Sequence, residues 1–180
     1  MDKIIHNDFK RRKDLNNTAK YIVSLNPQIV GFSSTCADFH VFLYIAKIIK
    51  KLNSNIKIIF GGPQPSAVAY EALSAFNWID AIAIGESEEN ILPMINCLLN
   101  EGNYEDVSGV IFKGQSNQTK VHQCLSDIDS MEFMNYDIFC NKDIMIDPNL
   151  IHHIETGRGC PFHCSYCLSG RLLNKKYRLF

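Results

Sequence analysis

The stretch IKIIFGGPQPS, residues 56–66, joins a strand pattern to a glycine-rich turn. Residues 56–60 hold too few polar side chains for a half-exposed strand, which predicts a strand in the interior of a sheet. The two glycines that follow allow the backbone to adopt a positive φ angle or to approach a ligand closely. This stretch therefore predicts a buried parallel strand with a candidate ligand loop at its carboxyl end.

The sequence on both sides repeats this alternation of strand and helix. Strand patterns occupy residues 3–7, 28–33 and 80–84, and helical periodicities occupy residues 14–25, 41–52, 66–76 and 89–100. Strands that alternate with helices in this way form right-handed crossovers, so the sheet is mainly parallel and carries helices on both faces. We predict a doubly wound α/β domain of the Rossmann or flavodoxin-like type over residues 1–104.

The pattern changes after residue 104. Two short β runs around a polar tip at residues 109–123 predict a hairpin, whereas residues 124–150 have no clean period and favour an extended linker. We therefore interpret residues 105–150 as a hairpin followed by a linker. The last stretch, residues 168–180, has the pattern of the start of a helix.

Composition excludes several classes of function. Eighteen basic and nineteen acidic residues give a net charge of -1, which offers no general electrostatic attraction for nucleic acid or a membrane surface. No stretch approaches the roughly 18 apolar residues that span a bilayer. Four of the seven cysteines are widely scattered, which suits reduced thiols and a cytoplasmic location better than a disulfide framework.

Three loops follow strands of the predicted sheet at the edge where doubly wound folds bind ligands. These loops are residues 33–38, 61–66 and 85–88. The candidate cofactor-binding residues in them are Ser33, Ser34, Thr35, Gly61, Gly62, Pro63, Gly85 and Glu86. The alternative for each loop alone is a plain turn, and Glu86 with Glu88 would then stabilise the amino end of the next helix.

The segment GRGCPFHCSYC, residues 157–167, gathers three thiols at Cys160, Cys164 and Cys167. Three thiolates at this spacing can ligate three irons of a compact iron–sulfur cluster and leave the fourth iron open for a substrate or cofactor. The alternative is a zinc site with three cysteines and one histidine. The histidines available to such a zinc site are His152, His153 and His163.

This segment resembles the CxxxCxxC loop of radical S-adenosylmethionine enzymes, including the Arg-Gly-Cys-Pro lead-in and Tyr166 before the last cysteine. Residues 28–136 are similar to the cobalamin-binding domain that precedes the barrel in one large class of these enzymes. The triplet Ser33–Thr35 resembles the SxL element of that domain, and Gly61–Gly62 resembles its GG element. Its DxHxxG element has no counterpart in this chain.

The resemblance implies a [4Fe-4S] cluster held by Cys160, Cys164 and Cys167, with S-adenosylmethionine on the open iron and its adenine near the backbone of Tyr166. A reducing electron donor of the flavodoxin or ferredoxin type would supply the electron that releases a 5'-deoxyadenosyl radical. In the cobalamin-dependent class, the corrinoid donates a methyl group or assists an oxidative cyclisation of the substrate.

The resemblance also implies that residues 151–180 begin a radical S-adenosylmethionine barrel. A barrel takes about 200 residues, and only thirteen follow Cys167 in this 180-residue chain. We therefore expect the N-terminal part of a longer enzyme, without a complete active site of its own. The alternative function is a flavodoxin-like or receiver-like binding module with a zinc-stapled cysteine loop and no catalysis.

Overall fold

The computed structural model divides the chain into two units, Met1–Gln123 and Cys124–Phe180, which are described separately. The structure describes residues 2–100, 102–104, 107–114, 124–125, 127–131, 155–162, 164–168 and 177–179. The predicted second run of the hairpin and most of the predicted linker lie outside these residues.

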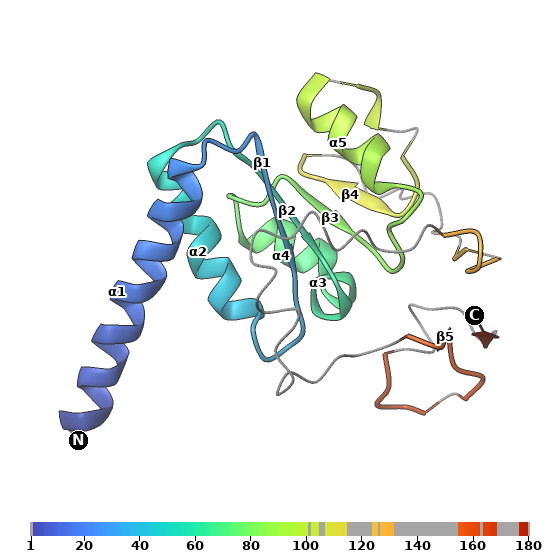
Figure 1. The fold of residues 1–180 in the computed structure, drawn as a ribbon, viewed down its shortest axis with the longest axis horizontal. Helices are drawn as coiled ribbons and strands as arrows, with labels where there is room; N and C mark the ends of the chain where they lie inside the picture. Colours follow the sequence, from blue (N-terminus) through green and yellow to red (C-terminus); the bar gives the residue numbers. More distant parts are fainter. Residues whose placement is uncertain are drawn as a thin grey trace, which may run out of the picture. The chain divides into compact units, whose positions relative to one another are not determined.

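The first unit is built around a four-stranded sheet (Figure 1). In chain order its elements are α1 (Asp2–Ser24), β1 (Ile29–Ser33), α2 (Phe39–Leu52), β2 (Lys57–Gly61), α3 (Pro63–Ala67), α4 (Ala69–Ala75), β3 (Ala81–Ala83), α5 (Ile91–Asn100) and β4 (Val110–Phe112). The strand order is β1-β2-β3-β4, in which the first three strands are parallel and β4 is antiparallel to β3. Because β2 lies between β1 and β3, the predicted interior position of the strand at residues 56–60 is confirmed.

Helices pack on both faces of this sheet. The core of one face comes from α1, α2, α4 and the sheet, with the buried residues Ala19, Ile45, Ala46, Ile49, Ile58, Phe60, Ala69, Ala72 and Ile82. The core of the other face comes from α5 and the sheet, with Ile59, Ala81, Ala83, Met94, Cys97, Leu98, Val110 and Phe112. Alternate residues of β2 and β3 enter different cores, as the strand period of two requires. The predicted doubly wound, mainly parallel α/β fold is therefore confirmed.

The predicted strand at residues 3–7 is wrong, because these residues belong to α1, which runs from Asp2 to Ser24. The helix predicted at residues 14–25 is confirmed as the second half of α1. A short apolar run forms a strand only if a neighbouring strand accepts its hydrogen bonds, whereas a helix satisfies its backbone groups locally. Leu25 follows the helix and is exposed, so it does not share the buried face of Ala19.

Two further differences concern the helix predicted at residues 66–76 and the end of the sheet. The helix is divided into α3 and α4 at Val68, whose φ of -127° and ψ of 32° are not helical. The first piece begins earlier than predicted, at Pro63, because proline suits the first helical position. Strand β4 pairs with β3, so the sheet continues beyond residue 104, where the sequence places the end of the α/β domain.

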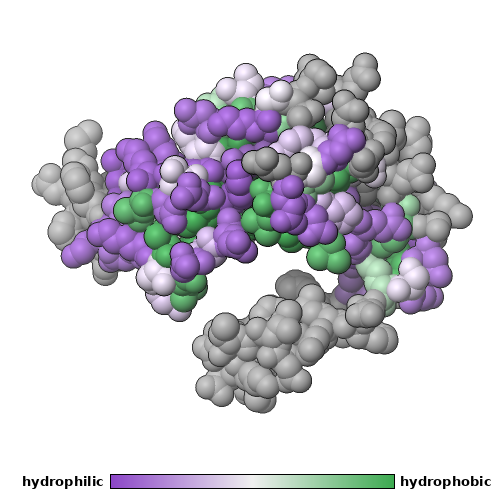
Figure 2. Space-filling model, turned by 90° about the horizontal axis from the view of Figure 1, so that it is seen from above, coloured by the Kyte–Doolittle hydropathy of each residue, from purple (hydrophilic) through white to green (hydrophobic). Residues whose placement is uncertain are grey.

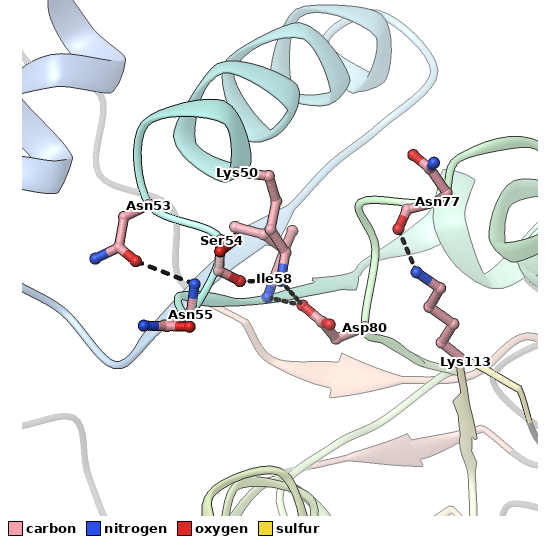
Figure 3. A network of polar contacts seen from close by, with 8 residues as sticks. All are labelled: Lys50, Asn53, Ser54, Asn55, Ile58, Asn77, Asp80 and Lys113. Atoms are coloured by element: carbon pink, nitrogen blue, oxygen red, sulfur yellow. Dashed lines mark hydrogen bonds and ion pairs between the residues drawn. The ribbon is translucent and has the colours of Figure 1, made fainter.

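A polar network ties together the amino ends of β2 and β3 (Figure 3). The Asp80 carboxylate accepts a hydrogen bond from the backbone N–H of Ile58 at 2.6 Å and pairs with the Lys50 ammonium at 2.8 Å. Lys50 also donates to the Ser54 carbonyl at 3.3 Å, and Lys113 donates to the Asn77 carbonyl. The edge of the sheet opposite the predicted ligand loops is therefore closed by side chains.

The surface of the described residues is mainly hydrophilic in the view of Figure 2, with hydrophobic residues in separate groups. The large exposed apolar side chains of the first unit are Tyr21, Leu25, Leu52, Tyr70, Leu92 and Leu99. Among the described helices, none combines the length and the apolar composition that crossing a bilayer requires. The predicted cytoplasmic location stays a prediction.

The second unit contains a small antiparallel ladder between β5 (Gly157–Arg158) and β6 (Arg178–Leu179). Gly157 is required in this ladder, because a Cβ atom there would stand 2.7 Å from the Arg178 carbonyl oxygen. Residues 178–179 form a strand, so the helix predicted for residues 168–180 does not extend to the end of the chain. The ladder joins the first two residues of the cysteine segment to residues beyond its end.

Candidate cofactor site at the carboxyl edge of the sheet

The three predicted ligand loops begin at the carboxyl ends of β1, β2 and β3. The parallel register places Ser33 of β1 opposite Gly61 of β2, and Phe60 opposite Ile82 of β3. Because the strands end at similar heights, the loops that follow them lie along one edge of the sheet. The structure therefore brings together the candidate residues of the first unit.

The first two loops interlock at Gly62 and Ser34. Gly62 has a φ of 91°, a conformation that favours glycine, and it stands just before α3. The Ser34 N–H donates to the Gly61 carbonyl at 3.0 Å, and the Gln64 N–H donates to the Ser34 carbonyl at 3.3 Å. A Cβ atom on Gly62 would stand 2.8 Å from both the backbone nitrogen and oxygen of Ser34. Glycine is therefore required at position 62 for two reasons. It has the positive φ that was predicted as one alternative, and its lack of a Cβ atom lets the Ser34 backbone come close.

At this edge the hydroxyl of Ser34 is buried. Ser34 is only 2% exposed, and among the described residues its buried side-chain oxygen has no hydrogen-bond partner. Leaving a buried hydroxyl without a partner costs about 1–3 kcal/mol. The neighbouring Ser33 and Thr35 are exposed. A buried hydroxyl with no partner among the described residues, beside two exposed residues that carry hydroxyls, favours ligand binding at this edge.

The first loop has a fixed conformation. The Asp38 carboxylate accepts hydrogen bonds from the backbone N–H and the hydroxyl of Thr35, at 2.7 and 3.1 Å. Asp38 precedes α2 but makes no capping bond to that helix. At the start of α2, Phe39 packs edge-on against Phe60 with ring centroids 5.5 Å apart. These contacts hold the loop at both ends, so the positions of Ser33 to Thr35 do not depend on a ligand.

The third loop follows β3 and is linked to the second through Ser66, which the sequence did not single out. The Ser66 hydroxyl donates to the Ala83 carbonyl at 3.4 Å and accepts from the Gly85 N–H at 3.1 Å. Gly85 has a φ of 73°, a conformation that favours glycine, and its predicted role in cofactor binding stays a prediction. The sequence signal for Ser66 was its place at the end of the predicted ligand loop, residues 61–66.

Glu86 lies in this third loop and is buried, with 7% of its surface exposed. Helix α5 begins at Ile91 and has no acidic residue in its first turn, so Glu86 and Glu88 are not the predicted helix charge pair. Asn90 precedes the helix, is 5% exposed, and donates from its side-chain nitrogen to the Ser108 carbonyl at 3.2 Å. Within the part of the chain that the structure describes, the Asn90 side-chain oxygen has no hydrogen-bond partner. The loop thus places a second buried polar atom without a partner near the carboxyl edge.

Beside these loops, on the sheet face that packs against α5, some residues of β1 are exposed. Gly31, Ser33 and Gly61 share this face, because Gly31 pairs with Ile59, which belongs to the α5 core, and Ser33 pairs with Gly61. Gly31 and Ser33 are exposed although they lie within a strand. These three residues form a strip of small side chains, which we call the small-residue strip. It leaves space for an extended group against the sheet.

The candidate metal ligands lie in the second unit. Cys160, Cys164 and Cys167 form no disulfide with any described cysteine; Cys164 is exposed and the other two are partly exposed. The N–H of Cys167 donates to the Cys164 carbonyl at 3.0 Å, and Tyr166 between them is 91% exposed. Within the described ranges, no three His, Cys, Asp or Glu side chains converge closely enough to hold one metal ion. The histidines of the zinc alternative lie outside the described residues.

The architecture and its carboxyl-edge loops define a doubly wound domain of the cofactor-binding class. The family model of the B12 binding domain matches residues 3–92, half of the 180-residue chain. The chain therefore belongs to the B12 binding domain family. This membership confirms the predicted resemblance to enzymes that carry a cobalamin-binding domain.

Proteins similar to this chain in sequence include a methyltransferase and a cyclase. The chain is 26% identical over 165 residues to an uncharacterized methyltransferase of Pyrococcus horikoshii, which covers 91% of this chain and 36% of the relative. It is 28% identical over 161 residues to the anaerobic magnesium-protoporphyrin IX monomethyl ester cyclase of Rubrivivax gelatinosus, covering 81% of this chain and 28% of the relative. The chain thus spans about a third of the length of these relatives.

The fold is also similar to a solved structure of the radical S-adenosylmethionine methyltransferase TsrM from Kitasatospora setae, with cobalamin and a [4Fe-4S] cluster bound. The TM-score is 0.64 at 13% sequence identity, over 94% of this chain and 36% of TsrM. At this identity the likeness concerns the fold.

Proposed function

We propose that this chain forms the cobalamin-binding part of a radical S-adenosylmethionine methyltransferase or cyclase. The observation that carries the proposal is the close packing of Gly62 against Ser34 at the carboxyl edge of the sheet in a B12 binding domain, with a buried Ser34 hydroxyl that has no partner among the described residues. The names of the relatives, a methyltransferase and a cyclase, support the two reaction types.

The residues of the carboxyl edge fit a large cofactor with many polar groups. Gly62 lets the turn after β2 pack against the backbone of Ser34, so the loops after β1 and β2 lie together at this edge. The hydroxyl of Ser34 can donate or accept one hydrogen bond, and the small-residue strip offers room for an extended group. Bound cobalamin would supply methyl transfer or assist an oxidative ring closure. The chain itself would bind, orient and shield it.

The cysteine segment supports the second half of the proposal. Three cysteines at the CxxxCxxC spacing can supply the ligands of a [4Fe-4S] cluster with one open iron, and their exposure leaves them accessible to cluster assembly. Cys160, Cys164 and Cys167 would hold the cluster, with S-adenosylmethionine at the open iron beside Tyr166. The cluster and S-adenosylmethionine would supply radical chemistry, with electrons from a flavodoxin or ferredoxin type of donor.

A titration of the chain with hydroxocobalamin tests the proposed cofactor. Binding at the carboxyl edge changes the polarity around the corrin ring, so the visible absorption should shift and saturate as protein is added. The Ser34→Ala variant should need more protein for the same shift, because it lacks the hydroxyl. An unchanged spectrum and no protein-bound corrinoid after gel filtration would contradict the proposal.

A further inference from the structure

Ser66 makes contacts that reach beyond its own helix. It lies in α3, only 9% of its surface is exposed, and its backbone N–H donates to the Gly62 carbonyl at 3.1 Å. Its hydroxyl donates to the Ala83 carbonyl at 3.4 Å and accepts from the Gly85 N–H at 3.1 Å. One side chain therefore connects the turn after β2 with the turn after β3.

The Gly85 N–H has this serine as its hydrogen-bond partner. The preceding residue, Ile84, donates to the carbonyl of Gly109, which directly precedes β4, at 2.8 Å. At Gly85 the backbone changes to a φ of 73° and leaves the sheet. A partly buried N–H at this point needs a partner, because leaving one unsatisfied costs free energy. The Ser66 hydroxyl fills this role at the first residue beyond the sheet.

We infer that Ser66 is a positioning residue: its hydroxyl holds the loop at residues 84–90 against the turn at Gly62. Without it, the turn at Gly85 loses the bond that fixes its direction, and the loop that carries Glu86 and Asn90 moves relative to Ser34. The effect on cobalamin binding rests on the proposed function. The effect on the loop itself does not, because the contacts exist in the chain without a ligand.

Amide hydrogen exchange at Gly85, measured by NMR on the chain without ligand, tests the inference. Ser66→Ala removes both hydrogen bonds, and Ser66→Cys keeps a side chain of the same connectivity but replaces the hydroxyl with a slightly larger, weakly hydrogen-bonding thiol. We expect either variant to exchange the Gly85 amide about tenfold faster than the unchanged chain. Ser66→Thr retains a hydroxyl and should preserve the slow exchange. The matched control is Ser74→Ala, because Ser74 is exposed on α4.

The outcomes separate the inference from the proposed function. Slow exchange at Gly85 in a folded Ser66→Ala variant overturns the inference, and if that variant does not fold, the Ser66→Cys variant decides. A second readout is the affinity for hydroxocobalamin, which we expect to fall several-fold in both variants and to be restored by threonine. If the unchanged chain binds no hydroxocobalamin, the proposed function fails, whereas the exchange measurement still decides the role of Ser66.

Discussion

The backbone nitrogen and oxygen of Ser34 both lie 2.8 Å from the place that a Cβ atom on Gly62 would take. The substitution Gly62→Ala therefore combines a strained positive φ with a contact that only a backbone shift can relieve. We expect the free energy of unfolding to fall by about 2–4 kcal/mol. Urea denaturation followed by circular dichroism measures this loss.

Gly114→Ala is the matched control for that substitution. Gly114 also has a positive φ, 79°, but nothing lies within 4 Å of the added Cβ atom. In Gly114→Ala the free energy of unfolding should fall only by the cost of the backbone conformation, about 1–2 kcal/mol. Equal losses for the two variants would show that the contact with Ser34 contributes nothing.

Ser34→Ala should affect stability and binding in opposite directions. The substitution removes a buried oxygen that has no hydrogen-bond partner, so the free energy of unfolding should stay the same or rise by about 1 kcal/mol. The affinity for hydroxocobalamin should fall about tenfold, because one hydrogen bond to the cofactor is lost. Urea denaturation and the spectral titration measure the two effects. A clear loss of stability would mean that the hydroxyl has a partner in the folded chain.

Asp80→Asn should destabilise the amino edge of the sheet. Asp80 and Lys50 form an ion pair at 2.8 Å with side chains 18% and 17% exposed, and the same carboxylate oxygen binds the Ile58 N–H. Asparagine keeps an acceptor for Ile58 but leaves the ammonium of Lys50 without its counter-charge. We expect a loss of about 1–3 kcal/mol in the free energy of unfolding.

A double-mutant cycle with Lys50→Met isolates this pair. The sum of the losses in unfolding free energy of the two single variants should exceed the loss of the double variant by about 1 kcal/mol or more, because the two residues are in contact. Lys51→Met serves as the control, because Lys51 is exposed on the same helix. Strict additivity in the Lys50 cycle would argue against an energetic role for the ion pair.

Cys164→Ala should abolish cluster assembly. After anaerobic reconstitution with iron and sulfide, the unchanged chain should bind about four irons and show charge-transfer absorption in the visible range. The variant should lose both, because it lacks one of three thiolates. Cys36→Ala is the matched control, since Cys36 is an exposed free cysteine of the first unit. One zinc and no iron in the unchanged chain would favour the zinc-stapled alternative.

The sheet could be predicted from the sequence because its strands are short apolar runs, which are typical of strands in the interior of a parallel sheet. The predicted strands at residues 28–33, 56–60 and 80–84 agree with β1, β2 and β3 to within about one residue at each end. The strand at residues 3–7 failed because its two isoleucines continue a helix that needs no partner strand. The break at Val68 could not be predicted, since apolar residues continue on both sides of it and α3 contacts both β2 and β3.

The site could be predicted where it depends on residue type at a strand end. Gly62 has the positive φ that was predicted as one alternative for the glycine pair after β2, whereas the positive φ of Gly85 was not predicted. The buried hydroxyl of Ser34 and the bridge made by Ser66 could not be predicted, because both arise from contacts between loops that are distant in sequence. The ligand roles of these residues and of Cys160, Cys164 and Cys167 stay predictions.

The single tryptophan of the chain, Trp78, precedes β3 at the closed amino edge of the sheet. Its ring packs against Phe76 with centroids 5.2 Å apart, and the Lys47 ammonium lies 5.1 Å from its centre. Its fluorescence should therefore report the integrity of the edge that carries Asp80, while the absorption of a bound corrinoid would report the opposite edge. The two ends of one sheet thus have separate optical signals, with which a folding defect can be told from a binding defect in the same sample.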